Sequence, residues 1–328
     1  MQKRREESYL RVVDLFSGAG GFARGFERAG FKIVLGLDND RSAIRTFKLN
    51  FPEAIALNED IRDVSGKDIL ELLGYAPKII IGSPPCEPFT GANPRREKNP
   101  LDRLLKDPMG QLTLHFIRIV SELRPEIFVM ENVPAIAEKD IRYAIEDLFE
   151  RAGYEKIYFN TLRAEDHGTP SHRLRVFISN IKISPPRTSK RVVVWDAISD
   201  LYEKRSGEAP NHEIIYLTGK KLRRIASVKR GEALYEFEGA SGRRFQNFVR
   251  LDPYDIAPTI MGSSRFIHPF EDRLLTVREQ ARLMGFPDDH IFVGGREEQY
   301  NQVGEAVPPT LAEAIARYIY EHYLFKLI

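Results

Sequence analysis

Short apolar runs alternate with helix-like periodicity through the first half of the chain. The pattern predicts strands at 10–16, 31–38, 78–85, 126–132, 154–162 and 173–181, and helices at 21–30 and 42–51. The third and fourth of these strands are apolar throughout, which is typical of strands buried on both faces of a parallel sheet. The order of strand and helix predicts an α/β fold with a doubly wound, mostly parallel sheet.

The texture of the sequence changes after about residue 180. Four β-prone segments without a strand–helix rhythm follow, at 191–198, 213–219, 233–239 and 244–251. Helical patterns return at 275–286 and at 308–325, and the second begins with two prolines. We therefore expect residues 1–180 plus 298–328 to form one domain and residues 181–297 to form a second, smaller, irregular and β-rich domain with a hinge.

Composition narrows the class of protein. The 328 residues are 42% hydrophobic and 29% charged, as in ordinary globular proteins, and the length favours two domains. No apolar run approaches the roughly 18 residues of a membrane span, and the first apolar stretch is too short for a signal peptide, so we expect a cytoplasmic protein without a membrane partner. The single cysteine, Cys86, excludes an internal disulfide and a multi-cysteine metal site.

Overall charge does not indicate nucleic acid, because 49 Lys and Arg face 47 Asp and Glu. Residues 220–250, however, hold nine cations against three acids; the cations are Lys220, Lys221, Arg223, Arg224, Lys229, Arg230, Arg243, Arg244 and Arg250. Such a segment contacts phosphates or forms a solvated face, and both readings stay open.

Ligands in doubly wound sheets gather at the carboxyl ends of the strands. Gly18, Gly20 and Gly21 lie between the first predicted strand and the helix that follows it, where a ligand can approach backbone amides. Asp38 ends the next strand, where an acid can hold ribose hydroxyls. The pattern indicates a nucleotide-like cofactor; a tight turn with a helix-capping acid is the alternative.

A second group of residues carries candidate reaction chemistry. Cys86 follows two prolines at a strand end, where a helix start or a neighbouring cation would lower its pKa; the alternative is a buried small hydrophobe. Glu131 ends an apolar strand and could donate a proton, or be a surface acid. Arg173 and Arg175 share one strand face and could bind an anion. Together these groups suit nucleophilic activation of an electron-poor ring followed by group transfer.

The same residues lie in eight ordered blocks, through which the chain resembles the cytosine-C5 DNA methyltransferases. The blocks are DLFSGAGGF, the acid of GLDND, Asp60 in NEDIRDV, GSPPCEPF, ENV, HRLRVF, RLLTVREQARLMGFP and QVGEAVPP. The likeness spans nearly the whole chain except about 181–255, where that family keeps its target recognition domain.

The resemblance implies a Rossmann-like enzyme that uses S-adenosylmethionine. Asp38 would hold the ribose, Asp60 would hold the adenine amino group, and the C-terminal segment would return to the first sheet. The implied cofactor-binding residues are Phe16, Gly18, Gly20, Asp38, Asp60, Ile61, Pro85, Leu112, Gly304 and Val307.

The resemblance also implies a covalent mechanism on a cytosine flipped out of duplex DNA. Cys86 would attack C6, Glu131 would protonate or hydrogen-bond N3, and Arg175 would hold O2 and orient Glu131, with Arg173 as a fourth catalytic residue. C5 would then take the methyl group, and the base that removes the C5 proton is not identified.

Two sets of cations are implied to contact DNA. The loop from Glu87 to about Asp107 would close over the DNA through Arg95, Arg96, Lys98 and Arg103. The recognition segment would contribute Lys220, Lys221, Arg223, Arg224, Arg243 and Arg244.

Several positions depart from the family pattern. Ser171 stands where Gln is usual, His167 where Tyr is common, Asp38 where Glu is typical, Glu87 where Gln is common, and Glu305 where Asn is usual. None of these changes removes a group that the mechanism requires.

We expect a DNA (cytosine-5-)-methyltransferase that acts as a monomer, beside a restriction endonuclease or alone. A methyltransferase of the same fold acting on transfer RNA is the close alternative; the 75 to 90 residues of the recognition segment and its cations favour DNA. A non-catalytic DNA-binding relative would not need Cys86, Glu131 and Arg175 together. A Rossmann-type oxidoreductase would leave Cys86 and the basic segment without a role.

Overall fold

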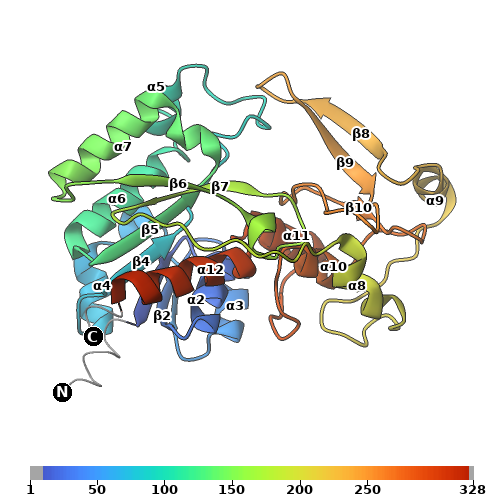
Figure 1. The fold of residues 1–328 in the computed structure, drawn as a ribbon, viewed down its shortest axis with the longest axis horizontal. Coiled ribbons are helices and arrows are strands. Elements are labelled where there is room, and N and C mark those ends of the chain that lie inside the picture. The colour runs from blue at the N-terminus through green and yellow to red at the C-terminus, as the bar shows by residue number, and fades with distance from the viewer. Residues whose placement is uncertain (1–9, 325–328) are drawn as a thin grey trace.

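A computed structural model describes residues 10–324 of the chain. Residues 1–9, part of the segment weighed as a leader, and Phe325, the last residue of the predicted C-terminal helix, lie outside this range. Figure 1 shows a larger α/β part and a smaller part whose strands form a separate sheet. Within residues 10–324, every helix is too short or too polar to traverse a lipid bilayer.

The larger sheet has seven strands in the order β3-β2-β1-β4-β5-β7-β6. They are β1 (Arg11–Leu15), β2 (Lys32–Leu37), β3 (Ile55–Leu57), β4 (Ile79–Gly82), β5 (Ile127–Asn132), β6 (Tyr158–Arg163) and β7 (Leu174–Ser179). The first five in this order run parallel, and β7 is antiparallel to both of its neighbours. The predicted fold class is confirmed, and the strand order reverses between β1 and β4, which is where such sheets bind ligands.

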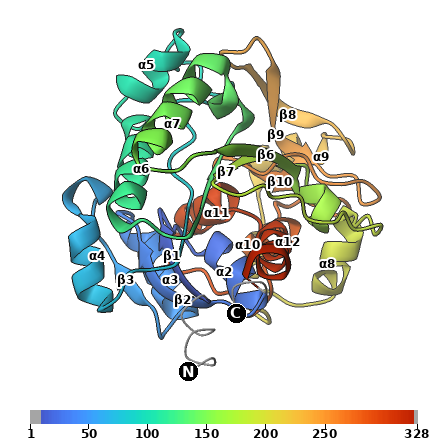
Figure 2. The ribbon, with the colours of Figure 1, turned by 60° about the vertical axis from the view of Figure 1, so that its left-hand side comes forward.

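Helices cover both faces of the larger sheet (Figure 2). One face packs against α2 (Gly21–Arg28), α3 (Arg41–Asn50) and α12 (Pro309–Ile319), and the other against α4 (Gly66–Leu73), α6 (Gln111–Leu123) and α7 (Lys139–Arg151). Successive residues of β1 point to opposite faces, so Val12 joins one apolar core and Val13 the other. Shorter elements are α5 (Pro100–Leu105), η1 (Ile61–Asp63), η2 (Pro134–Ala137) and η3 (Ala164–His167).

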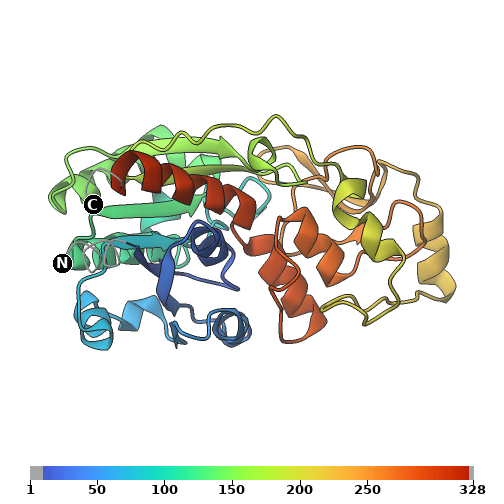
Figure 3. The same ribbon diagram turned by 60° about the horizontal axis from the view of Figure 1, so that its bottom comes forward.

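The C-terminal helix α12 returns to the first sheet and lies along α2 (Figure 3). A Cβ atom on Gly25 would stand 2.6 Å from the carbonyl oxygen of Pro309 and would collide with Ala312. The absence of a side chain at Gly25 therefore allows the two helix backbones to approach, and the expected return of this segment is confirmed. Residues 320–324 continue it as one π-helical turn, η4 (Tyr320–Leu324).

The smaller part contains a three-stranded sheet of β8 (Ala233–Glu238), β9 (Arg244–Arg250) and β10 (Phe266–Ile267). It also contains α8 (Val194–Tyr202), α9 (Gly219–Ala226) and α10 (Val277–Leu283), and α11 (Arg296–Glu305) leads back to the larger part. The strands expected at 233–239 and 244–251 are present, whereas 213–219 forms no strand.

The prediction of a strand at 191–198 is wrong, because most of that segment belongs to helix α8. Val194, Ile198 and Leu201 are spaced along one face of the helix and are fully buried. Three consecutive valines favour a strand locally, but packing against the core of the smaller part decides for the helix.

Candidate active site

The Gly-rich turn after β1 adopts left-handed backbone angles and is fixed by a hydrogen bond to one carboxylate. Phe16, Gly18 and Gly20 all have positive φ angles, of 58°, 51° and 89°. A Cβ atom on Gly20 would collide with the ring of Phe51, whereas one on Gly18 would meet nothing within 4 Å. Gly18 therefore faces open space, and Gly20 serves the packing of the turn.

Asp38 connects this turn to the end of β2. Its Oδ2 atom accepts a hydrogen bond from the Gly18 amide at 2.7 Å, and its Oδ1 atom accepts one from the Asp40 amide at 2.9 Å. Burial raises the pKa of the Asp38 carboxyl, and the two amides oppose that effect. The carboxylate is thus fixed beside the open face of the turn.

Asp14, in the middle of β1, is a candidate residue that the sequence prediction missed. It is fully buried, and neither carboxylate oxygen has a hydrogen-bond partner of good geometry within the described residues, although the Ala23 amide is close enough to oppose the rise of its pKa. Burial, reinforced by the nearby charge of Asp38, raises its pKa well above the usual value. An unpaired buried carboxyl favours a ligand that supplies a positive charge or a donor. The signal in the sequence was an acid inside an otherwise apolar strand.

Three predicted cofactor-binding residues share one apolar cluster. Ile61 and Leu112 are buried in it, and Phe16 packs against it. Asp60 precedes η1 and accepts two hydrogen bonds from the Arg62 guanidinium, at 3.0 and 2.6 Å. This pairing lowers the pKa of Asp60 to about 2. A ligand that uses the Asp60 carboxylate must therefore share it with Arg62.

The three remaining predicted cofactor-binding residues are Gly304, Val307 and Pro85. Gly304 packs directly against the backbone at Met261, and the Val307 carbonyl lies 2.5 Å from where a Cβ atom on Gly21 would be. Both residues are buried, so they close the junction between the Gly-rich turn and α11. Pro85 is half-buried beside Cys86.

Cys86 follows β4 and packs partly against the apolar cluster of Ile61 and Leu112. The residues after it form a turn, in which the amides of Phe89 and Thr90 donate to the Cys86 carbonyl at 3.0 and 2.9 Å. The expected helix start is therefore absent. Burial raises the pKa of the thiol, and the nearby charge of Arg175 works against that rise.

Glu131 and Arg175 form a buried ion pair, with Arg175 Nε 2.9 Å from Glu131 Oε1. Glu131 lies within β5 and Arg175 lies on the antiparallel neighbour β7, so adjacent strands hold the two side chains. The side-chain amide of Asn132 donates to the Pro84 carbonyl at 3.1 Å and ties the end of β5 to the Cys86 turn. A thiol, a carboxyl and a guanidinium thus meet at the end of the sheet where strands β4 and β5 terminate.

Arg173 has a different setting from Arg175. Its guanidinium donates to the carbonyl oxygens of Ile260 and Gly304 at 2.9 and 3.0 Å, and its side chain is buried. Burial and the neighbouring Arg175 lower the pKa of Arg173 to about 9. Arg173 therefore links the smaller part and α11 to the start of β7, and its assignment as a catalytic residue stays a prediction.

The predicted DNA-contacting cations divide into exposed and buried groups. Arg95, Lys98 and all six cations predicted in the recognition segment are exposed, and Arg96 is half-buried. Arg103 does not fit the prediction: it is buried and donates to both oxygens of Glu138 at 3.0 Å. Arg250, counted among the nine cations of residues 220–250, is also buried and holds backbone carbonyls and Asp272.

Comparison with known proteins decides the family. The family model for C-5 cytosine-specific DNA methylase matches residues 10–321. The chain belongs to this family. The methylase is 48% identical over 315 residues to M.MJ0563P of Methanocaldococcus jannaschii, a match that covers 94% of the chain and 99% of the relative. It is 34% identical to the type II methyltransferase M1.HphI of Haemophilus parahaemolyticus, with 94% and 86% covered.

A solved structure agrees with the fold of the methylase. A crystal structure described as a prophage-encoded DNA modification methyltransferase of Escherichia coli superimposes with a TM-score of 0.75 at 27% identity. The superposition covers 95% of this chain and 98% of the other.

The loop after Cys86 meets the tip of the β8–β9 hairpin in the methylase. The amide and the hydroxyl of Ser241 both lie 3.4 Å from the carbonyl oxygen of Gly91, to which they donate. Gly239 packs against the same carbonyl so closely that a Cβ atom would not fit. The loop and the hairpin, which both carry exposed cations, therefore lie side by side (Figure 1).

Three departures from the family pattern have defined surroundings. Ser171 is buried, with its hydroxyl 3.9 Å from the sulfur of Met284. His167 is half-buried, and burial lowers its pKa. Glu305 ends α11 and is exposed, yet burial of its carboxyl among neighbouring groups and the charge of Glu87 raise its pKa to about 7.

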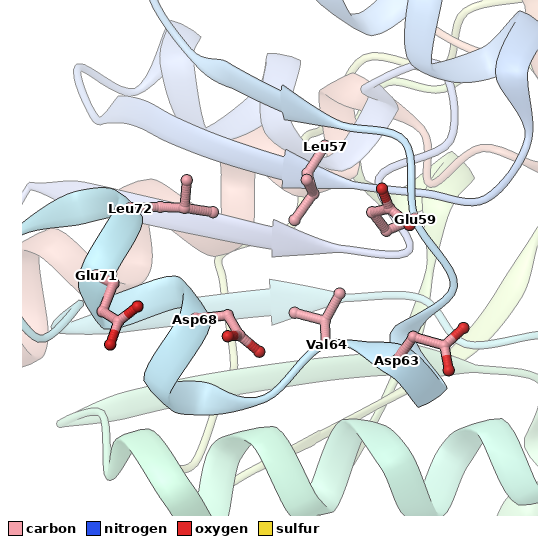
Figure 4. Close-up of a pocket in the computed structure, with 7 residues that line it drawn as sticks. All are labelled: Leu57, Glu59, Asp63, Val64, Asp68, Glu71 and Leu72. Atoms are coloured by element: carbon pink, nitrogen blue, oxygen red, sulfur yellow. The ribbon is translucent and has the colours of Figure 1, made fainter.

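A separate hollow lies between the edge strand β3 and α4 (Figure 4). It is lined by Leu57, Glu59, Asp63, Val64, Asp68, Glu71 and Leu72. It contains no predicted catalytic or cofactor-binding residue, and its four carboxylates would repel phosphates. We assign it no role in the reaction.

Proposed function

We propose that the methylase transfers a methyl group from S-adenosylmethionine to C5 of a cytosine flipped out of a specific duplex DNA sequence. The observation that carries this proposal is the buried group of Glu131 and Arg175 beside the Cys86 thiol, close to the Gly18–Asp38 turn. Each of these groups has a separate task in cytosine chemistry, and an oxidoreductase would need none of them.

The residues around the Gly-rich turn fit the proposed cofactor. The open space at Gly18 leaves room for a ligand against the backbone, and the fixed carboxylate of Asp38 can accept hydrogen bonds from ribose hydroxyls. When bound, S-adenosylmethionine supplies an electrophilic methyl group.

Cys86 acts as the nucleophile toward C6 of the cytosine. Because burial keeps the thiol protonated near neutral pH, attack requires removal of its proton, and Arg175 stabilises the thiolate that results. The bond between sulfur and C6 moves the C5=C6 electron pair toward C5, which then has the nucleophilicity to take a methyl group.

Glu131 and Arg175 stabilise the charge that develops on the ring. Glu131 donates a proton or a hydrogen bond to N3, while Arg175 holds Glu131 and donates to O2. Both side chains are buried, where a stacked base cannot reach them, so the target must leave the helix at a cost of roughly a few kcal/mol.

The exposed cations of both parts of the protein hold the DNA backbone. Arg95, Arg96 and Lys98 come from the loop after Cys86, and the others come from the smaller part, residues 181–297, as the recognition unit. Residues 1–180 with 298–328 form the catalytic unit. The methylase acts as a monomer on one base at a time, beside a cognate endonuclease or alone.

Trapping with 5-fluorocytosine tests this function. Fluorine at C5 cannot leave as a proton, so the enzyme should remain bonded to duplex DNA that carries its target sequence when S-adenosylmethionine is present. Cys86→Ala should form no adduct but should still bind the cofactor by calorimetry. Adducts formed only with transfer RNA, or none while cofactor is bound, would overturn the proposal.

A further inference from the structure

The proposed reaction needs one group that the residues described so far do not supply. After methyl transfer, C5 carries both the methyl group and its original hydrogen, and Cys86 cannot leave until that hydrogen is removed. Glu131 and Arg175 are engaged with each other and with the ring. A base supplied by the protein would therefore come from another element beside the Cys86 turn.

Glu305 is held in a defined position at the end of α11. The Arg173 guanidinium donates to the Gly304 carbonyl at 3.0 Å and approaches the Glu305 carbonyl at 3.5 Å. The Glu305 side chain stands over Gly262, where an added Cβ atom would be 2.7 Å from its Oε1 atom. Within residues 10–324, no hydrogen bond or ion pair engages its carboxylate, which is therefore free to take a proton.

Contacts on either side of Glu305 place it between the strand that carries Arg175 and the cofactor turn. Arg173 donates to the Gly304 carbonyl, and Ala306 and Val307 pack against Gly21. The charges of Glu87, Asp40, Asp38 and Arg173 also act on the Glu305 carboxyl. Its charge in turn acts on Cys86. In methyl transfer to C5, the reacting carbon lies between these same two regions.

We propose that Glu305 is the base that removes the C5 proton in this methylase, a role that rests on the proposed function. The Glu305 carboxylate takes the hydrogen as a proton. The electron pair of the C5–H bond becomes the C5=C6 double bond, and the C6–S bond breaks with its electron pair leaving on Cys86 as thiolate. Glu131 takes back the proton that it gave to N3. The products are 5-methylcytosine, free thiolate and a protonated Glu305 that returns its proton to solvent.

The chemistry of this position supports the assignment. A base that works near neutral pH is most effective with a pKa close to that pH. Burial of the Glu305 carboxyl, reinforced by its acidic neighbours, raises its pKa to about 7. The residue usual in the family here is Asn, which cannot accept a proton at this pH. The exposure of Glu305 gives the captured proton a path to water.

The test follows methyl transfer and C5–H cleavage separately in Glu305→Gln. Duplex DNA with cytosine tritiated at C5 and a methyl donor labelled with ¹⁴C report the two events in one reaction. We expect tritium release to slow about 100-fold or more, with a ¹⁴C-methylated covalent adduct accumulating before it. Glu305→Asp, which keeps a carboxylate one methylene shorter, should fall between this variant and the wild type.

5-Fluorocytosine DNA separates this inference from the proposed function. Trapping precedes proton removal, so Glu305→Gln should trap at the wild-type rate. If the wild type itself does not trap, the proposed function fails. If Glu305→Gln traps normally but releases tritium as fast as the wild type, or slows both labels equally without an adduct, Glu305 is not the base.

Glu87→Gln is the matched control, because it removes an equal negative charge from a residue that acts on Glu305. Without the Glu87 charge the pKa of Glu305 should fall, so the acidic limb of the tritium-release profile should move to lower pH without adduct accumulation. Accumulation of adduct in Glu87→Gln would assign the effect to charge alone and overturn the proposal.

Discussion

The Nε atom of Arg175 lies 2.9 Å from the Oε1 atom of Glu131, and both side chains are buried. The two groups act on the Cys86 thiol in opposite directions. Arg175 favours the thiolate and lowers the pKa of Cys86, whereas Glu131 disfavours it and raises the pKa. Because Cys86 is the sole cysteine, its alkylation reports these effects without interference.

Arg175→Met should move the alkylation of Cys86 by iodoacetamide to higher pH, because the thiolate loses its nearest positive charge. Methyl transfer should fall about 100-fold or more, since a charge-stabilising donor is lost from the reacting ring. The rate of alkylation against pH is the measurement, and Arg151→Met, on the exposed face of α7, is the control. A profile that moves equally in both variants would assign the shift to something other than the ion pair.

Glu131→Gln should have the opposite effect on the thiol. Removal of the negative charge lowers the pKa of Cys86, so alkylation at pH 8 should become faster than in the wild type. Turnover should nevertheless fall about 100- to 10,000-fold, because Gln cannot deliver a proton to N3. Slower alkylation together with lost turnover would show that Glu131 holds the site together rather than acting on the ring.

The convergence of Cys86, Glu131 and Arg175 could be predicted from the sequence because each lies at or near the end of a recognisable strand. Strand order in a doubly wound sheet then brings those ends together. Neither Arg103 in α5 nor Arg250 at the end of β9 could be identified as buried, because a cation has the same sequence signature whether it meets solvent or a backbone carbonyl.

Asp14 and Glu305 became candidates only through their surroundings. For Asp14 this is complete burial without a hydrogen-bond partner of good geometry, and for Glu305 it is burial of its carboxyl and the set of acids that acts on it. Both depend on contacts between residues far apart in sequence. The helix at 194–202 was missed for the same reason, since tertiary packing overrode the β propensity of its valines.

Gly18 and Gly20 should respond differently to replacement by Ala. Gly20→Ala places a methyl group into the ring of Phe51 and should destabilise the fold, while both variants carry the cost of a positive φ, about 1 kcal/mol. Gly18→Ala adds its methyl group to open space, so the fold should persist and cofactor affinity should fall. Denaturant unfolding and calorimetric binding of S-adenosylmethionine separate the two; unchanged binding in Gly18→Ala would remove the turn from the cofactor site.

Arg95 and Arg103 offer a second matched pair. Arg95→Ala should leave stability unchanged, weaken DNA binding and reduce the salt dependence of that binding by about one phosphate contact. Arg103→Ala should instead lower the free energy of unfolding by roughly 3 kcal/mol, since it leaves Glu138 and two backbone carbonyls without their donor. DNA titrations at several salt concentrations and urea unfolding are the measurements. A stable Arg103→Ala with a reduced salt slope would restore the original prediction for Arg103.

His268 should make the methylase less stable in acid. It is fully buried, and its Nδ1 atom accepts the amides of Phe270 and Glu271 at 3.3 and 3.2 Å, an arrangement that requires the neutral ring. Burial and Arg273 lower its pKa to about 4. The unfolded chain takes up a proton here near pH 6.5, whereas the folded protein does not until about pH 4, so stability present above pH 6.5 is lost as pH falls between these values. This one group should contribute about 1.4 kcal/mol per pH unit in that window.

Urea unfolding of the wild type and of His268→Gln from pH 7.5 to 4.5 measures how steeply the free energy of unfolding depends on pH in each. The comparison isolates His268 because Gln can accept hydrogen bonds from the same two amides without titrating. Equal slopes would mean that His268 is already protonated in the folded protein.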